Sequence, residues 1–161
     1  MFGFFKKKKE PFVLTSPVAG ELKKLSSVND PVFAQKMMGD GIAVKPDESE
    51  IVNVYAPVSG KIVFLPNSKH AFGIETKDRK QILIHIGIDT VNLKGKGFTT
   101  YAEQGNKVKH GDKIISFDSN VIKSNKLDDI VMVIMTKGYD KKINPLVRYN
   151  QEVLVDQKLL A

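Results

Sequence analysis

The sequence contains no cysteine among its 161 residues. This absence excludes disulfide bonds, thiolate zinc sites and cysteine nucleophiles, so any covalent chemistry must use another side chain. Apolar residues never run for the roughly 20 positions that a membrane-spanning helix needs, which excludes a transmembrane body. The first ten residues lack the long apolar stretch and the small-residue cleavage site of a secretory signal. We therefore expect a cytoplasmic protein.

The composition is that of a folded globular chain, with 42% apolar and 27% charged residues. At this length one domain with a real core is expected, and a second would be cramped. We predict a single domain over residues 11–161, preceded by a basic and aromatic tail over residues 1–10.

The net charge of +7 raises the question of an anionic partner. Only Lys6 to Lys9 form a run, and most other lysines lie beside acidic residues or in turns, which indicates a solvated basic surface and no nucleic-acid binding. Phenylalanines precede the run, so residues 1–9 could contact an anionic membrane surface. A frayed tail without a partner is the alternative.

Short apolar runs separated by Gly, Pro, Asn and Asp predict an all-β protein, an antiparallel β-sandwich or irregular barrel. The expected strands cover residues 51–55, 61–65, 71–76, 82–86, 113–117, 130–135 and 152–155. Short helical turns are expected at residues 31–35 and 121–126, where the strand pattern lapses.

The pattern Pro-Val-x-Gly-x-Leu/Ile occurs twice, at residues 17–22 and 57–62. Proline fixes φ at a strand entry, and glycine accepts a positive φ or a close backbone approach, so each copy can form a turn that starts a strand. A similar glycine-rich turn precedes residues 42–44. The repeat predicts an internal duplication of the fold.

The segment of residues 81–91 combines a strand pattern with a histidine. Because successive strand side chains point to opposite faces, one face should carry Ile82, Ile84, Ile86 and Ile88. The opposite face should carry Leu83, His85, Gly87 and Asp89. With the isoleucines in the core, Gly87 would leave space beside His85 and Asp89 would supply a carboxylate, a setting that suits a reactive imidazole.

A second histidine, His70, lies fifteen residues earlier. Alternation places it on one face with Ser68 and Phe72, so the Ser68 hydroxyl could hydrogen-bond the ring and fix its tautomer. If the two strands are antiparallel neighbours, the two imidazoles can face each other. Spacing alone leaves open a purely structural role for either histidine.

The run His85-Ile86-Gly87-Ile88-Asp89-Thr90-Val91-Asn92-Leu93 resembles the phosphorylation-site signature of the glucose-type IIA components of the phosphoenolpyruvate:sugar phosphotransferase system. The resemblance extends to residues 29–34, 38–43, 70–72 and 105–112. It covers nearly everything after the tail and weakens only toward the C-terminus.

This resemblance implies a β-sandwich in which His85 is phosphorylated on Nε2 and His70 stabilises the phosphoryl group. A backbone carbonyl would hold His85 Nδ1, and Ser68, where the family commonly has threonine, would orient His70. The family's apolar docking face maps to Val32, Phe33, Met37, Met38, Leu83 and Val91. Two acidic positions that meet an arginine of the donor correspond to Asp30 and Asp89.

The resemblance also implies the partners. The donor would be the histidine phosphocarrier protein HPr, and the acceptor a cysteine of a IIB domain that lies outside this sequence, during sugar uptake. A mostly neutral imidazole can attack phosphorus without a separate base, and no P-loop motif is present, which suits transfer between proteins. No cofactor and no metal are expected.

Two other readings of the residues remain open. The Pro-Val-x-Gly segment at residues 57–62 and residues 108–114 also resemble biotinyl and lipoyl carrier domains, although neither Lys36 nor Lys137 has the usual surroundings of a modified lysine. Two histidines and an aspartate would suit a zinc peptidase of similar fold, but the usual His-x-His pair is missing. His110 has a turn-like setting, and we assign it no chemistry.

Overall fold

The structure is a computed structural model that describes residues 11–161, so the predicted tail and its membrane contact lie outside the described residues. The strands are β1 (Leu14–Thr15), β2 (Gly20–Lys24), β3 (Asp40–Pro46), β4 (Ile51–Tyr55), β5 (Gly60–Phe64), β6 (Ala71–Glu75), β7 (Gln81–Ile86), β8 (Phe98–Thr100), β9 (Lys107–Val108), β10 (Lys113–Asp118), β11 (Val131–Lys137), β12 (Glu152–Val153) and β13 (Lys158–Leu160). The helices are α1 (Pro31–Ala34) and α2 (Ser119–Ser124), with 3-10 turns η1 (Leu25–Ser27) and η2 (Thr90–Leu93).

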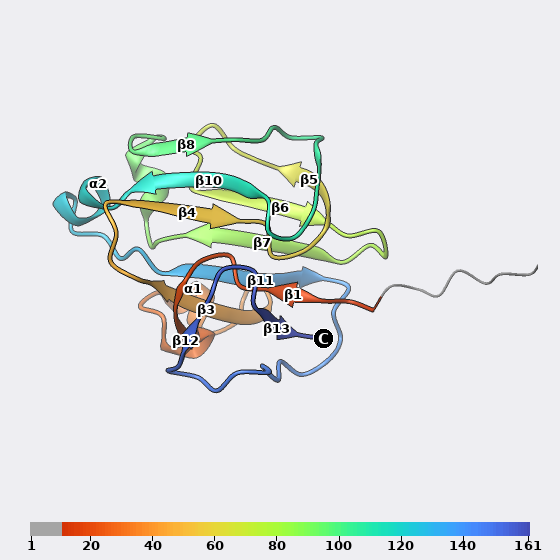
Figure 1. Ribbon diagram of the computed structural model, residues 1–161. Coiled ribbons are helices and arrows are strands. Elements are labelled where there is room, and N and C mark those ends of the chain that lie inside the picture. The colour runs from red at the N-terminus through yellow and green to blue at the C-terminus, as the bar shows by residue number, and fades with distance from the viewer. Residues whose placement is uncertain (1–10) are drawn as a thin grey trace, which may run out of the picture.

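The strands form an eight-stranded sheet of order β12-β2-β3-β11-β7-β6-β5-β9, a three-stranded sheet β4-β10-β8 and the pair β1-β13. Neighbouring strands are antiparallel. Figure 1 shows β4, β10 and β8 lying in front of β5, β6 and β7. The predicted antiparallel sandwich is confirmed, and the sheets do not close into a barrel.

The predicted duplication is visible in the order of the large sheet. Strands β12, β2 and β3 on one side of the central β11-β7 pair are matched by β9, β5 and β6 on the other. The residue two places before each Pro-Val-x-Gly turn hydrogen-bonds the proline of the other turn: Thr15 N donates to Pro57 O at 2.8 Å, and Tyr55 N donates to Pro17 O at 2.9 Å. The repeat therefore marks a pseudo-two-fold relation between the two halves.

The glycines that end the two turns, Gly20 and Gly60, start β2 and β5 and have no positive φ. A Cβ on Gly20 would overlap the carbonyl of Lys45, and one on Gly60 would overlap the carbonyl of Glu75. Of the two reasons that the sequence suggested for glycine here, the close backbone approach is the one that applies.

The seven expected strands are present within two residues of their predicted ends, and so are both helical turns. Strands β2 and β3 were indicated only through the turns that precede them, and the two- and three-residue strands β1, β8, β9 and β13 were not predicted. Segments this short contain too few residues to show an alternation, so only the pairing partner defines them as strands.

Two apolar clusters lie on opposite faces of the eight-stranded sheet. The larger one fills the sandwich and contains Ile82, Ile84 and Ile86. The smaller one lies outside, beneath η1 and α1, and contains Leu25, Val28, Phe33, Ala43, Ile88, Ile130, Met132 and Ile134. The expectation that Ile88 shares the inner face is wrong, because β7 ends at Ile86 and the positive φ of 75° at Gly87 turns the chain.

Replacing Gly60 by alanine tests the close approach of the repeat turn. We expect Gly60→Ala to lower the free energy of unfolding by about 3 kcal/mol, because backbone rather than a flexible side chain blocks the new methyl group. The control Gly105→Ala adds a methyl group with nothing within 4 Å, at a φ of 98°, and should lose only about 1 kcal/mol from backbone strain. Equal losses in urea denaturation would contradict the steric explanation.

Candidate functional site

His85 lies in the middle of the large sheet, on its outer face. Strand β7 places it opposite Ala71 of β6 and opposite Met132 of β11. The alternation predicted for residues 82–86 is confirmed, because the isoleucines are buried while Leu83 and His85 are half-buried on the other face. Neighbours on both sides therefore fix the backbone under this imidazole.

The His85 ring is held by the turn that follows its own strand. Its Nδ1 lies 2.9 Å from the carbonyl oxygen of Gly87. A carbonyl can only accept, so Nδ1 carries the hydrogen and the lone pair of the neutral ring lies on Nε2. The single hydrogen bond thus fixes both the orientation and the tautomer.

The Gly87 carbonyl is itself fixed by the segment before β11. Gly87 N donates to Ile130 O at 2.7 Å, and Ile88 N donates to Asp128 O at 3.0 Å. The Thr90 hydroxyl donates to the carbonyl of Ile86. A Cβ on Gly87 would lie 2.6 Å from Asp128 O, so only glycine fits at this place. Sequence reasoning missed these supporting carbonyls, since backbone groups about forty residues away leave no signal in the side chains.

His70 lies beside His85 just before β6, and the two rings meet edge to face with centroids 5.0 Å apart. The expected hydrogen bond is present, with Ser68 Oγ 2.7 Å from His70 Nδ1. The reasoning from strand alternation was nevertheless wrong. Residues 67–70 form a turn with a positive φ of 56° at Lys69, and Phe72 points into the inner core.

Burial keeps both imidazoles neutral. It lowers the pKa of His85 to about 4, with repulsion from His70 as the second cause, and outweighs the Gly87 carbonyl and the Asp30 carboxylate, which favour the proton. Burial also lowers the pKa of His70. At neutral pH the Nε2 lone pair of His85 is therefore available without a base to remove a proton.

Helix α1 covers the other side of the His85 ring. Asp30 caps it by accepting a hydrogen bond from Val32 N at 2.9 Å, and Pro31 occupies its first position, both common at helix starts. Phe33 then projects inward, with its ring centroid 4.8 Å from that of His85. Three rings in a row, those of Phe33, His85 and His70, form the centre of the site.

The residues expected to form a docking face surround these rings. Val32, Met37, Met38 and Val91 expose 42–70% of their surface, Leu83 is half-buried, and Phe33 is only 8% exposed. Phe33 is mostly covered because it belongs to the outer apolar cluster, and its contact with a partner stays a prediction. Asp30 is half-buried and Asp89 is exposed. Asp89 does not share a strand with His85, since it lies in the turn before η2 with a φ of 60°.

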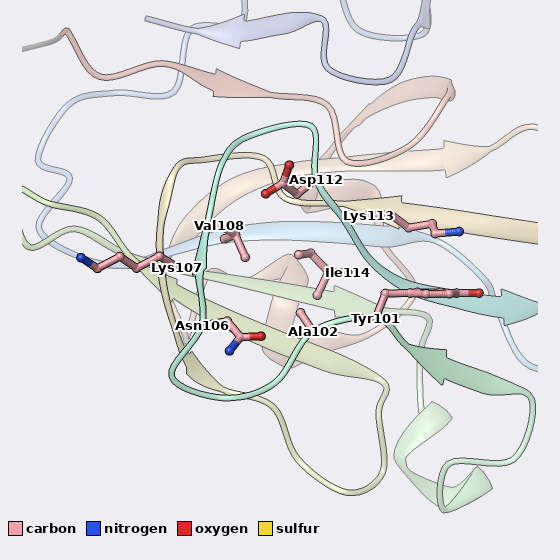
Figure 2. Close-up of a pocket in the computed structure, with 8 residues that line it drawn as sticks. All are labelled: Tyr101, Ala102, Asn106, Lys107, Val108, Asp112, Lys113 and Ile114. Atoms are coloured by element: carbon pink, nitrogen blue, oxygen red, sulfur yellow. The ribbon is translucent and has the colours of Figure 1, made fainter.

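Another hollow lies elsewhere, with a volume of about 450 Å³ between residues 101–108 and the start of β10. In Figure 2, Ala102, Val108 and Ile114 lie at its centre, while the side chains of Lys107 and Lys113 extend away from it in opposite directions. The Lys113 ammonium lies 4.0 Å from the ring centroid of Tyr101. Neither His70 nor His85 lines this hollow.

Residues 12–141 match the family model of the phosphoenolpyruvate-dependent sugar phosphotransferase system, EIIA 1. The chain belongs to this family. It is therefore a phosphocarrier of that system and a component of a phosphotransferase. Among solved structures, the EIIA chain is similar to the glucose permease IIA from Mycoplasma capricolum, at 34% identity and a TM-score of 0.80. The match covers 98% of this chain and 97% of the other.

Membership of the EIIA family favours the phosphocarrier over the two other readings, the biotinyl or lipoyl carrier and the zinc peptidase. Within residues 11–161 of the EIIA chain, no three side chains of His, Asp or Glu come together in an arrangement that could hold a metal ion. Over the same residues, each helix is too short or too polar to cross a membrane.

The low pKa of His85 predicts a pH-dependent stability. An imidazole whose pKa falls on folding binds protons more readily in the unfolded chain. The contribution of neutral His85 to the free energy of unfolding is therefore complete above pH 6.5 and is lost as the pH falls toward 4. Between pH 7 and 4 we expect the wild type to lose about 2–3 kcal/mol more free energy of unfolding than His85→Gln. Urea denaturation at several pH values measures this difference. Parallel curves for the two proteins would contradict the burial argument.

Proposed function

We propose that His85 is the residue of this EIIA protein that carries the phosphoryl group, on Nε2. The observation that carries this proposal is the hydrogen bond from Nδ1 to the Gly87 carbonyl, which leaves the lone pair on Nε2. His70 beside the ring and the exposed apolar residues around it are further support.

In the transfer, the Nε2 lone pair forms a bond to phosphorus while the bond from phosphorus to the donor nitrogen breaks. The proton on Nδ1 stays in place, so the ring becomes positively charged as the new bond forms, and the Gly87 carbonyl stabilises that charge. In the onward step the same proton lets His85 leave as a neutral imidazole. Positioning and electrostatic stabilisation supply most of the catalysis in such a loose transition state.

We assign His70 the role of a hydrogen-bond donor to the oxygens of the phosphoryl group. If the Ser68 hydroxyl donates to Nδ1 of His70, the ring hydrogen lies on its Nε2 and can be directed at the phosphate. Ser68 is then a positioning residue that selects this tautomer. Its smaller side chain leaves more rotational freedom than a threonine would.

The partners follow from the family. EIIA proteins of this system work in general with HPr and with IIB domains, and we propose that HPr loads His85 and that a IIB cysteine receives the phosphoryl group, in the cytoplasm and during sugar uptake. Glucose is the sugar that the similar glucose permease IIA suggests. Val32, Met37, Met38, Leu83 and Val91 would form the docking face, with Asp30 and Asp89 meeting an arginine of the donor.

Labelling separates the two histidines. With labelled phosphoenolpyruvate, its kinase and HPr, we expect His85→Gln to remain unlabelled, because the attacking nitrogen is gone. His70→Gln should still accept the label but pass it to a IIB domain at least about a hundredfold more slowly, because one donor to the transferring group is weakened. The label should be acid-labile and base-stable, as a phosphorus–nitrogen bond is.

His110→Gln is the control for that experiment and should be labelled like the wild type, because His110 pairs with Asp156 on an exposed surface. Labelling of His85→Gln but not of His70→Gln would reverse the assigned roles. An unlabelled wild type would refute the proposed donor.

A charge on the docking face should slow both partners. We expect Val91→Asp, at a side chain that is 48% exposed, to reduce kcat/KM for HPr and for the IIB domain by roughly tenfold, with the stability unchanged. Leu146→Asp places the same charge at another exposed site, 61% accessible, and should leave both rates unchanged. Similar rates for Val91→Asp and the wild type at limiting partner concentration would place the docking face elsewhere.

A further inference from the structure

The peptide group between Gly87 and Ile88 is held at both of its polar ends. Its carbonyl oxygen, that of Gly87, accepts the hydrogen bond from His85 Nδ1. Its N–H, that of Ile88, donates to the carbonyl of Asp128 at 3.0 Å. Because a peptide group is planar, fixing its N–H also fixes the direction in which its carbonyl points. The hydrogen bond that orients His85 therefore depends on the position of Asp128.

The side chain of Asp128 fixes that position. Its Oδ1 accepts a hydrogen bond from Ile130 N at 2.9 Å. An aspartate that binds the backbone two residues further on forms a local turn of this kind. Ile130 in turn uses its own carbonyl to accept from Gly87 N at 2.7 Å. The two carbonyls that hold the Gly87 turn thus belong to the two residues that this side-chain bond joins.

A lysine holds the same segment from the opposite direction. Lys45 lies on β3, which flanks β11 on the side away from β7. Its ammonium pairs with Asp129, whose side chain is 15% exposed, and lies 3.7 Å from Asp128 Oδ1. Residues 125–130 connect α2 to β11 and belong to neither element. Side-chain bonds therefore contribute to a position that no strand ladder supplies.

The effect of Asp128 on the imidazole is carried by backbone and not by charge. Burial lowers the pKa of His85, and the carboxylate that opposes this shift is that of Asp30. The carboxylate of Asp128 faces Lys45 instead. Its influence on His85 passes through the hydrogen bonds to Ile130 and to the Gly87 turn, so it should depend on geometry alone.

We propose that Asp128 is a positioning residue for His85, whose carboxylate holds the Ile130 N–H and thereby keeps the Gly87 carbonyl on Nδ1 of the ring. This inference rests on the proposed function and adds a side chain to the backbone groups that fix the reacting tautomer. Once the segment loosens, the neutral ring can also place its hydrogen on Nε2, where it removes the attacking lone pair. Asp128 thus raises the fraction of rings that are ready to react.

Three substitutions separate the geometry of Asp128 from its charge. Asp128→Ala removes the acceptor of the Ile130 N–H. Asp128→Glu keeps the charge but is too long for the same turn, and it carries the test alone if the alanine variant does not fold. Asp128→Asn keeps the acceptor and removes the charge. We expect the alanine and glutamate variants to lower kcat for transfer from HPr roughly tenfold with KM unchanged, and the asparagine variant to match the wild type.

The tautomer of His85 is the direct readout. At neutral pH, the 15N chemical shifts of its ring nitrogens in the unphosphorylated protein should place the hydrogen on Nδ1 in the wild type and in Asp128→Asn. Asp128→Ala and Asp128→Glu should show a mixture of both tautomers. A purely structural role would lower the free energy of unfolding without moving these shifts.

Asp118 offers the matched control. It makes the same kind of bond at the start of α2, where its carboxylate accepts from Asn120 N at 2.9 Å. Asp118→Ala should therefore lose stability while the His85 tautomer and kcat stay those of the wild type. A changed tautomer in Asp118→Ala would show that any lost turn disturbs the site and would overturn the assignment to Asp128.

The remaining outcomes separate the positioning role from the function on which it rests. Wild-type shifts and kcat in Asp128→Ala and Asp128→Glu would overturn the inference and leave the proposed function intact. A lower kcat without a change of tautomer would also overturn it. Asp128→Asn as slow as Asp128→Ala would assign the effect to charge, against the proposal. A wild type that HPr does not label would refute the proposed function and the inference together.

Discussion

The hydrogen bond from His85 Nδ1 to the carbonyl of Gly87 is the constraint on which the site depends. It fixes the tautomer of a ring that burial keeps neutral, and it does so with a group that cannot change its protonation state. The bond requires a carbonyl in one place, and three backbone groups, those of Ile130, Asp128 and Ile86, hold the turn that provides it. The orientation of the imidazole is thus determined by main chain from two distant parts of the sequence.

Burial has opposite effects at this site. It removes the imidazoles from water, which lowers their pKa values and keeps the Nε2 lone pair of His85 available. A carrier that uses this atom, as we propose, must nevertheless expose it to a protein partner. The structure combines both by packing the ring between Phe33 and His70 while several surrounding apolar residues remain open to solvent.

Much of this arrangement could be predicted from the sequence, and the placements that could not be predicted have physical reasons. The alternation in residues 82–86 correctly placed His85 on the outer face, because period-2 patterning persists as long as the strand does. It failed at Ile88 and Asp89, where a positive φ at Gly87 ends the pattern. The alternation rule failed again at Ser68, because residues 67–70 form a turn and not a strand. Phe33 was assigned to the docking face through the family resemblance alone, and its burial could not be predicted, because a four-residue helix has no period long enough to show its buried face.

The duplication has a consequence for how His85 is surrounded. The connection from β2 to β3, residues 25–39, and the connection from β5 to β6, residues 65–70, occupy equivalent places in the two halves. The longer one carries Asp30, Val32 and Phe33, while the shorter one carries Ser68 and His70. His85 lies between them, and its counterpart across the pseudo-two-fold axis is Ile134, fully buried under the longer connection. The two equivalent connections thus differ in length, and loop length rather than strand architecture distinguishes the half in which His70 lies beside His85 from the half in which Ile134 is covered.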